Sequence, residues 1–272
     1  MSRTFDALRR ATVQETQEPQ VPRVPANSSA PERPSQDRPP GDVRRIAAPP
    51  RPESHIIIDS DRRNNTVREH FRYLEHKLQR LRQSAGLKRI LVTSSAPREG
   101  KTVVAGNLAA TLACGTARVL LIDADMRGCG RNTPFGLAGS PGLADILEGR
   151  VAPLDAMLYL DALKVYYIPA GQPSASPADL VQGRQMHDLL ASLEFDWVIV
   201  DSPPVGAFAD ALSMATRVDG VVLVARSGVT AKHDLERSIE ALKDCRIVGL
   251  VLNGHDKRRK EYYRTYYTAG AR

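Results

Sequence analysis

The sequence predicts an α/β fold, with a doubly wound, mostly parallel sheet flanked by helices. After Gly86, short apolar runs alternate with helical stretches, which is the order expected of βαβ units. The runs are rich in Val, Ile and Leu without polar alternation, which is typical of strands buried on both faces. Charged or hydroxyl residues follow three of the runs, where such sheets carry their ligand crevices. The expected strands are 89–93, 118–122, 164–168, 197–200, 220–225 and 247–252.

The first 63 residues differ in composition from the rest of the 272-residue chain. Ten of the nineteen prolines lie within residues 1–52, mixed with Arg, Gln, Ser and Glu and almost without aromatic side chains. Such a segment buries too little apolar surface to offset the entropy of ordering. We therefore expect residues 1–63 to form a disordered, proline-rich arm, residues 64–256 one domain, and residues 257–272 a flexible tail.

Composition excludes several classes of protein. With 42% hydrophobic and 25% charged residues, the sequence is ordinary for a globular protein. Its three cysteines are too few and too widely spaced for a disulfide framework or a zinc site, which favours a reducing compartment. No apolar run approaches the roughly 18 residues that cross a bilayer. We expect a cytoplasmic protein, whose formal net charge of +7 attracts anions without selecting among nucleotides, nucleic acids, lipids and proteins.

An amphipathic helix is expected over residues 64–83. Its apolar side chains recur at spacings of three and four, and they are Val67, Phe71, Leu74, Leu78 and Leu81. The opposite face is dense with charge, and Glu69 and Arg72 have the spacing of an intrahelical ion pair. That face is either solvated or a contact between subunits, and the spacing alone leaves both open.

A strand, a tight turn and a helical stretch follow one another over residues 89–112. The turn reads Ser-Ala-Pro-Arg-Glu-Gly-Lys-Thr over residues 95–102. Backbone N–H groups of such a turn bind phosphate oxygens, Lys101 neutralises the outer phosphates, and the Thr102 hydroxyl can bind Mg²⁺. Ser95 replaces the usual first glycine, so the Gly-Lys-Thr triplet by itself is a weak signal.

Acidic residues follow two further expected strands. Asp123 and Asp125 come after the second strand, and Asp201 follows the fourth. Because the carboxyl ends of neighbouring parallel strands line one crevice, these carboxylates can converge beside residues 95–102. Mg²⁺ takes only a few protein oxygens and keeps several waters. We therefore expect Thr102 and Asp201 to hold Mg²⁺, with Asp123 and Asp125 acting through water.

Three motifs and a terminal tyrosine cluster lie in order along residues 64–267. The motifs are SSAPREGKT at 94–102, VLLIDADMR at 119–127 and VIVDSPPV at 198–205. This combination resembles the bacterial tyrosine kinases (BY-kinases) of the capsule and exopolysaccharide type, which are P-loop NTPases. The resemblance implies the free-standing cytoplasmic form of the kinase, with ATP as phosphoryl donor, ring-like homo-oligomers and phosphorylation of tyrosines on a neighbouring subunit.

The resemblance also implies a place in the cell. Such a kinase controls polysaccharide polymerisation or export through a membrane-embedded chain-length regulator or co-polymerase, at the inner face of the plasma membrane. Polysaccharide-synthesis proteins are its further expected substrates.

Four tyrosines lie within six positions near the C-terminus, among basic residues: Tyr262, Tyr263, Tyr266 and Tyr267. A polar, basic tail cannot bury four phenols, which indicates exposed phosphoacceptors. Each phosphorylation adds about 1.5 to 2 negative charges, which would repel the acidic site and change assembly. Two other interpretations stay open, an aromatic helix docked on the sheet edge and a tail that stacks on bases, although no specific nucleic acid is expected.

The resemblance and the chemistry of phosphoryl transfer together assign roles in the site. The residues expected to contact the nucleotide are Ser95, Ala96, Pro97, Arg98, Glu99, Gly100, Lys101, Thr102, Val103 and, at the adenine, Asn253. Lys101 is expected to hold the β and γ phosphates. Asp123 or Asp125 accepts the tyrosine proton or orients the hydroxyl through water, and the sequence does not decide between these two aspartates.

Two residues depart from the family pattern. Arg98 stands where the loop usually has glycine, and a positive φ there would cost an arginine roughly 1 kcal/mol or more. Arg98 can weaken activity, or add a cation at the phosphates or at a subunit boundary. Glu75 stands where the helical assembly motif, which Glu69 and Arg72 match, has a second arginine, and this weakens the expectation of a ring.

Two alternative functions stay open. A positioning or partitioning ATPase would dimerise on nucleotide instead of phosphorylating tyrosine, but its distinguishing lysine would fall at Ala96. A nonenzymatic regulator would bind nucleotide, or only a partner, because its altered loop prevents turnover.

Overall fold

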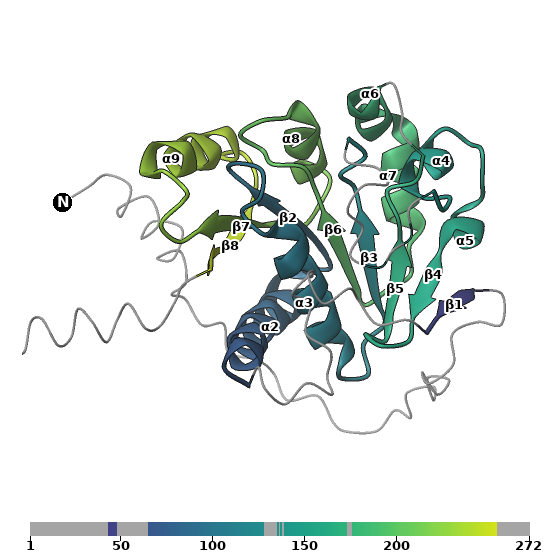
Figure 1. Cartoon of the computed structure of the whole chain (residues 1–272), viewed down its shortest axis with the longest axis horizontal. Coiled ribbons are helices and arrows are strands. Elements are labelled where there is room, and N and C mark those ends of the chain that lie inside the picture. The colour runs from purple at the N-terminus through teal and green to yellow at the C-terminus, as the bar shows by residue number, and fades with distance from the viewer. Residues whose placement is uncertain are drawn as a thin grey trace, which may run out of the picture. The chain divides into compact units, whose positions relative to one another are not determined.

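The computed structural model describes residues 43–47, 65–127, 135, 137, 139–172 and 176–254. In this part of the chain one sheet carries helices on both faces (Figure 1). Its strands are β1 (Arg44–Ile46), β2 (Arg89–Ser94), β3 (Val119–Asp123), β4 (Leu158–Leu160), β5 (Val165–Ile168), β6 (Trp197–Asp201), β7 (Gly220–Arg226) and β8 (Ile247–Asn253). The helices are α2 (Asn65–Ala85), α3 (Lys101–Ala113), α4 (Leu143–Leu147), α5 (Pro153–Ala156), α6 (Pro177–Gln182), α7 (Arg184–Ser192), α8 (Ala209–Ala215) and α9 (Lys232–Ala241).

The sheet is mostly parallel, as the sequence predicts. Its strand order is β1-β4-β5-β3-β6-β2-β7-β8. Strands β4 and β5 pair antiparallel and all other described neighbours pair parallel, so β1 and β4 run against the other six. Each of the six expected strands forms within one residue of its expected bounds. The predicted doubly wound α/β class is confirmed.

Two short strands at one edge were not predicted. Strand β4 is too short to stand out as an apolar run, and β1 contains two arginines. Strand β1 is held by specific contacts, since Val43 beside it is buried and Arg45 Nε donates to Asp161 Oδ1 at 2.9 Å. It lies inside the segment 1–63 for which we predict a disordered arm. The rest of that segment and the predicted tail at 257–272 lie outside the described residues.

Helices bury an apolar layer on each face of the sheet. Helices α2 and α3 cover one face, and α4, α6, α7, α8 and α9 cover the other. The alternation within single strands explains how one strand serves both layers: Leu120 and Ile122 of β3 join one cluster, and Val119 and Leu121 join the other. Burial on both faces accounts for the continuous apolar runs of the sequence.

Helix α2 confirms the predicted amphipathic helix. Leu78 is 1% exposed, and three further residues of the predicted stripe pack against the same cluster: Phe71, Leu74 and Leu81. Val67, near the start of the helix, stays exposed. At the other end, Arg82 Nη2 donates to Asp196 Oδ1 at 3.0 Å, which fixes the last turn beside the start of β6.

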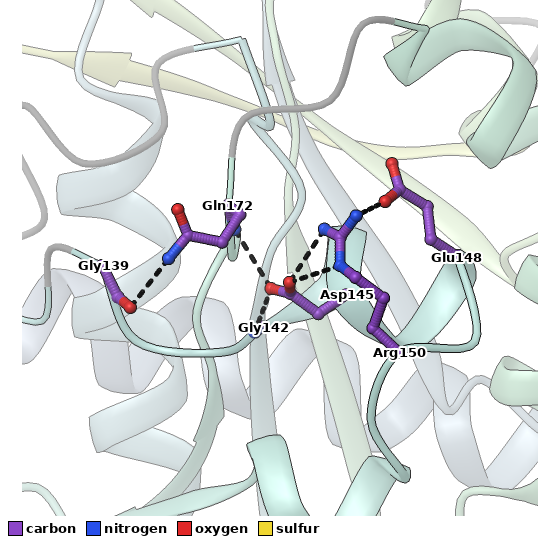
Figure 2. A network of polar contacts seen from close by, with 6 residues as sticks. All are labelled: Gly139, Gly142, Asp145, Glu148, Arg150 and Gln172. Atoms are coloured by element: carbon purple, nitrogen blue, oxygen red, sulfur yellow. Dashed lines mark hydrogen bonds and ion pairs between the residues drawn. The ribbon is translucent and has the colours of Figure 1, made fainter.

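A buried carboxylate ties the start of α4 to the loop after β5 (Figure 2). Asp145 accepts hydrogen bonds from the backbone N–H groups of Gly142 at 2.9 Å and Gln172 at 3.0 Å, and from Arg150 Nη2 at 2.8 Å. These donors lower the pKa of Asp145, although burial opposes them as the largest single influence. Gln172 Nε2 in turn donates to Gly139 O at 2.9 Å. Two loops far apart in the chain are thus held together.

This closeness predicts the effect of one added methyl group. A Cβ at Gly142 would overlap the carbonyl oxygen of Pro169 and the backbone of Gly171, which cannot swing aside as a side chain can. We expect Gly142→Ala to lower the free energy of unfolding by about 1–3 kcal/mol in urea denaturation. Gly115→Ala is the control because no atom lies within 4 Å of its Cβ position. An equal loss in both variants would contradict the packing described.

Candidate functional site

Three strand ends meet at one edge of the sheet. Strand β6 lies between β3 and β2, and β2 leads into residues 95–100, which we call the phosphate loop. Asp123 at the end of β3 and Asp201 at the end of β6 are direct partners in the register. Because neighbouring strands lie about 4.8 Å apart, both carboxylates are within reach of one ion. The convergence expected from the sequence is present.

The phosphate loop leads directly into helix α3. Gly100 is the N-cap residue, with φ 95, and Lys101 and Thr102 are the first two residues of the helix. A Cβ at Gly100 would overlap Nδ2 of Asn253, so both the backbone angle and the close approach require glycine here. Lys101 is only 8% exposed. The loop therefore places a lysine and the positive end of the helix dipole at the same point.

Glu99 turns into the protein instead of toward solvent. Its side chain accepts a hydrogen bond from the backbone N–H of Ala96 at 3.0 Å and another from the Thr230 hydroxyl. Glu99 is 1% exposed, and its backbone carbonyl accepts a hydrogen bond from Asn253 Nδ2 at 3.0 Å. Of the expected nucleotide contacts, Glu99 and Asn253 thus use their side chains within the protein in this structure.

The two strand-end carboxylates are poorly compensated. Burial raises the pKa of Asp201 to about 6, while the charge of Lys101 and a hydrogen bond with Thr102 lower it. Burial, reinforced by the charge of Asp201, raises the pKa of Asp123 to about 8. In the described part of the protein, Asp201 Oδ1 is buried and has no hydrogen-bond partner. The protein neighbours thus do not stabilise two negative charges at this site, and without a cation a proton is retained there near neutral pH.

This arrangement fits a magnesium ion. The donor set is one hydroxyl, on Thr102, with the carboxylates of Asp201 and Asp123, and Mg²⁺ binds few protein oxygens beside its waters. Within the described ranges no three His, Cys, Asp or Glu side chains gather to form a metal site, so nothing here resembles a zinc centre. A divalent cation would give the unpartnered oxygen of Asp201 the partner that it lacks.

A small cavity lies between the carboxylates and helix α3. Its lining residues are Thr102, Ala105, Leu121, Asp123, Phe135, Tyr167 and Asp201. Tyr167 was not predicted as a site residue, because its only sequence signal is a place in an apolar strand. Its hydroxyl lies 3.5 Å from Asp123 Oδ2, and the backbone N–H of Asp125 donates to Asp123 Oδ1 at 3.1 Å. Asp123 thus has two acidic neighbours, Asp201 and Asp125.

Other predicted residues lie elsewhere or outside the description. Arg72 Nη1 donates to Glu69 Oε1 at 3.2 Å on the exposed surface of α2, which confirms the predicted intrahelical pair and leaves its role between subunits a prediction. Four expected phosphoacceptors lie outside the described residues, and they are Tyr262, Tyr263, Tyr266 and Tyr267.

Comparisons with known proteins identify the group to which this arrangement belongs. A family model described as ParA, NUBPL iron-transfer P-loop NTPase, matches residues 87–257. The tyrosine-protein kinase YwqD of Bacillus subtilis is 34% identical over 186 residues, which cover 67% of this chain and 78% of that protein. The chain belongs to the BY-kinase family of P-loop NTPases. Within that family the putative tyrosine-protein kinase EpsB of Ralstonia solanacearum is 33% identical, and the match covers 71% of this chain but only 26% of EpsB.

Solved structures agree with the family. The kinase domain of the Escherichia coli tyrosine kinase ETK superposes with a TM-score of 0.68 at 30% identity, covering 72% of this chain and 79% of that one. The cell division ATPase MinD of Pyrococcus furiosus superposes with a TM-score of 0.52 at 26% identity, covering 63% and 74%. In the described residues, no helix combines the length and apolar composition needed to cross a membrane.

The departure from the BY-kinase pattern at Arg98 has a structural consequence. Arg98 has φ 64, in the left-handed region that favours glycine. The backbone strain anticipated from the sequence is therefore present. The Arg98 carbonyl accepts a hydrogen bond from Arg226 Nη1 at 3.0 Å, which helps to hold the strained residue in place.

Two substitutions separate backbone strain from the loss of the arginine side chain. Arg98→Gly and Arg98→Ala both remove the guanidinium, but only glycine adopts φ 64 without strain. We expect the glycine variant to be more stable than the alanine variant by about 1 kcal/mol in urea or thermal unfolding. Equal stability of the two variants would contradict the strain at this position.

The raised pKa values predict a pH dependence of stability in the absence of metal and nucleotide. Asp123 has a folded-state pKa of about 8 and an unfolded value near 3.8, so between these values the folded protein holds a proton that the unfolded chain has lost. The free energy of unfolding should therefore fall as the pH rises from about 4 to about 8. Asp123→Asn should reduce this fall, as urea titrations at pH 5 and pH 8 would show. A constant difference between variant and parent at both pH values would contradict it.

Proposed function

We propose that the chain is an ATP-dependent protein-tyrosine autokinase that phosphorylates its C-terminal tyrosine cluster in trans. The observation that supports this most directly is the meeting of Lys101 and Thr102 with Asp123 and Asp201 at one sheet edge, in a chain of the BY-kinase family. Relatives are named tyrosine-protein kinases, as is the solved domain of ETK. The cluster of Tyr262, Tyr263, Tyr266 and Tyr267 supplies acceptors within the same sequence.

We assign each residue a role from the chemistry of phosphoryl transfer. Lys101 and the amides of the phosphate loop bind the β and γ phosphates of ATP, at the start of α3. Thr102 and Asp201 hold Mg²⁺, and Asp123 acts on it through water. When bound, the ion neutralises charge on the transferring phosphoryl group. Asp123 or Asp125 accepts the proton of the incoming tyrosine hydroxyl or orients it through water.

The cellular setting is also a proposal. We place the protein in the cytoplasm, at the inner face of the plasma membrane through a membrane-embedded chain-length regulator or co-polymerase. One relative is a putative tyrosine-protein kinase of a cps region in Klebsiella pneumoniae, which supports a link to capsule or exopolysaccharide synthesis. The exposed Glu69–Arg72 pair of α2 supports a subunit contact in a ring-like homo-oligomer, with polysaccharide-synthesis proteins as further substrates.

A positioning ATPase is the second candidate. The resemblance to MinD favours it, whereas Ala96 stands where that group carries its distinguishing lysine. A nonenzymatic regulator is the third. Incubation with ATP and Mg²⁺ separates them, since hydrolysis without phosphotyrosine would favour the positioning ATPase and binding without turnover the regulator.

The kinase proposal predicts the outcome of a complementation experiment. One variant is Lys101→Ala, and the other replaces the four tyrosines of the cluster by Phe. We expect Lys101→Ala alone to lose phosphotyrosine by at least about 100-fold, because the phosphates lose their cation. Mixing the two variants should restore phosphotyrosine on the Lys101→Ala chain, as mass spectrometry of differently tagged chains would show.

The controls are the fold and the site of modification. Circular dichroism should show that both variants are folded. Phosphotyrosine outside residues 262–267, or no labelling of Lys101→Ala chains in the mixture, would contradict transfer between subunits to this cluster.

A further inference from the structure

A chain of polar contacts joins the phosphate loop to the turn between β7 and α9. Thr230 lies in that turn, and its Oγ1 accepts a hydrogen bond from the backbone N–H of Arg226 at 2.7 Å. The same hydroxyl donates to Glu99 Oε1, while Glu99 Oε2 accepts from the backbone N–H of Ala96. Thr230 thus connects the backbone of β7 with the interior of the loop.

Because the Glu99 carboxylate is buried, its stability depends on these hydrogen bonds. A carboxylate at 1% exposure is costly unless its oxygens are paired, and here each oxygen has one donor. The donor from outside the loop is the Thr230 hydroxyl. The contact also keeps the negative charge of Glu99 turned into the protein. Turned toward the loop's ligand, this charge would repel the anionic phosphates. Loss of the hydroxyl would leave a buried carboxylate oxygen without this partner.

Two further hydrogen bonds fix the backbone carbonyl groups of Arg98 and Glu99. Arg226 Nη1 donates to the carbonyl of Arg98, and Asn253 Nδ2 donates to the carbonyl of Glu99, both at 3.0 Å. In a planar trans peptide the C=O and the next N–H point in opposite directions. Holding these two carbonyls toward β7 and β8 therefore directs the N–H groups of Glu99 and Gly100 away from those strands.

We infer that Thr230 is a positioning residue that sets nucleotide affinity, by holding Glu99 so that the loop amides face the phosphates. Arg226 and Asn253 complete this brace, which we define as Glu99, Thr230, Arg226 and Asn253. The inference rests on the proposed binding of nucleotide at the phosphate loop. Thr230 acts through Glu99 and does not itself touch the reacting atoms. The brace also counters the strain of Arg98, because two of its hydrogen bonds hold the carbonyls at and after that residue.

The test compares Thr230→Val with Thr230→Ser in the full-length chain. Valine keeps the shape but lacks the hydroxyl, whereas serine retains it. We expect the dissociation constant of a fluorescent ADP analogue with Mg²⁺ to rise about tenfold in Thr230→Val, the weight of one hydrogen bond to a charged group, and to change by less than about twofold in Thr230→Ser. In phosphorylation assays KM for ATP should rise with kcat within about twofold.

Two controls guard against a general loss of structure. Val229→Ala alters an exposed neighbour in the same turn and should leave binding unchanged. Thermal melting shows whether Thr230→Val is folded. If that variant fails to fold, Glu99→Ala provides the second test, because it removes the carboxylate and should weaken binding at least as much. Adding Thr230→Val to Glu99→Ala should then cost less than about twofold more.

The outcomes separate this inference from the proposed function. Tight binding by the parent chain with equal affinities of Thr230→Val and Thr230→Ser would overturn the brace and leave the kinase proposal intact. Additive losses in the double variant would also overturn it. Absence of nucleotide binding by the parent chain itself would overturn both.

Discussion

The site depends on two acidic side chains that the sheet forces to be neighbours. Parallel pairing of β3 and β6 places Asp123 beside Asp201. Asp201 is buried and Asp123 is half-buried, so water screens their charges only in part. Neither residue could escape the other without breaking the register of the central strands. The cation that acts on Asp201 is Lys101, the first residue of α3. The fold therefore brings together two carboxylates whose charged forms need a further cation, which a metal-bound nucleotide would supply.

The conformation of the phosphate loop depends on contacts with other parts of the sheet. Its final glycine is required by a positive φ and by the close approach of Asn253, and the residue two positions earlier is an arginine under backbone strain. Such strain persists only where surrounding contacts hold it. Those contacts come from β7, β8 and the turn before α9, elements that lie more than a hundred residues further along the chain. The conformation of the loop thus depends on β7, β8 and the turn before α9 as well as on the loop's own sequence.

The sequence carried enough information for the fold class and for the main residues of the site. Six strands were predictable because burial on both faces makes their composition continuous, and Asp123 and Asp201 stand out as charges at the ends of apolar runs. Strand β1 was not predictable, because it pairs with β4 and its Arg45 contacts Asp161, and only the folded chain brings these partners near.

The contacts of single side chains were harder to predict. Tyr167 looks like any aromatic residue in a buried strand, and its place beside Asp123 follows from the register of β5 with β3. Glu99 was expected at the nucleotide, yet its carboxylate pairs with a threonine 131 positions away in sequence. Contacts of this kind join residues without any periodic signal, since they are determined by tertiary packing alone.

The most direct test of the account is a crystal structure of the full chain with Mg²⁺ and a non-hydrolysable ATP analogue. The account predicts a cation about 2.1 Å from Thr102 Oγ1, bound to Asp201 directly or through one water, with the β and γ phosphates against Lys101 and the loop amides. A nucleotide bound at another edge of the sheet, or a cation remote from both Asp123 and Asp201, would contradict it.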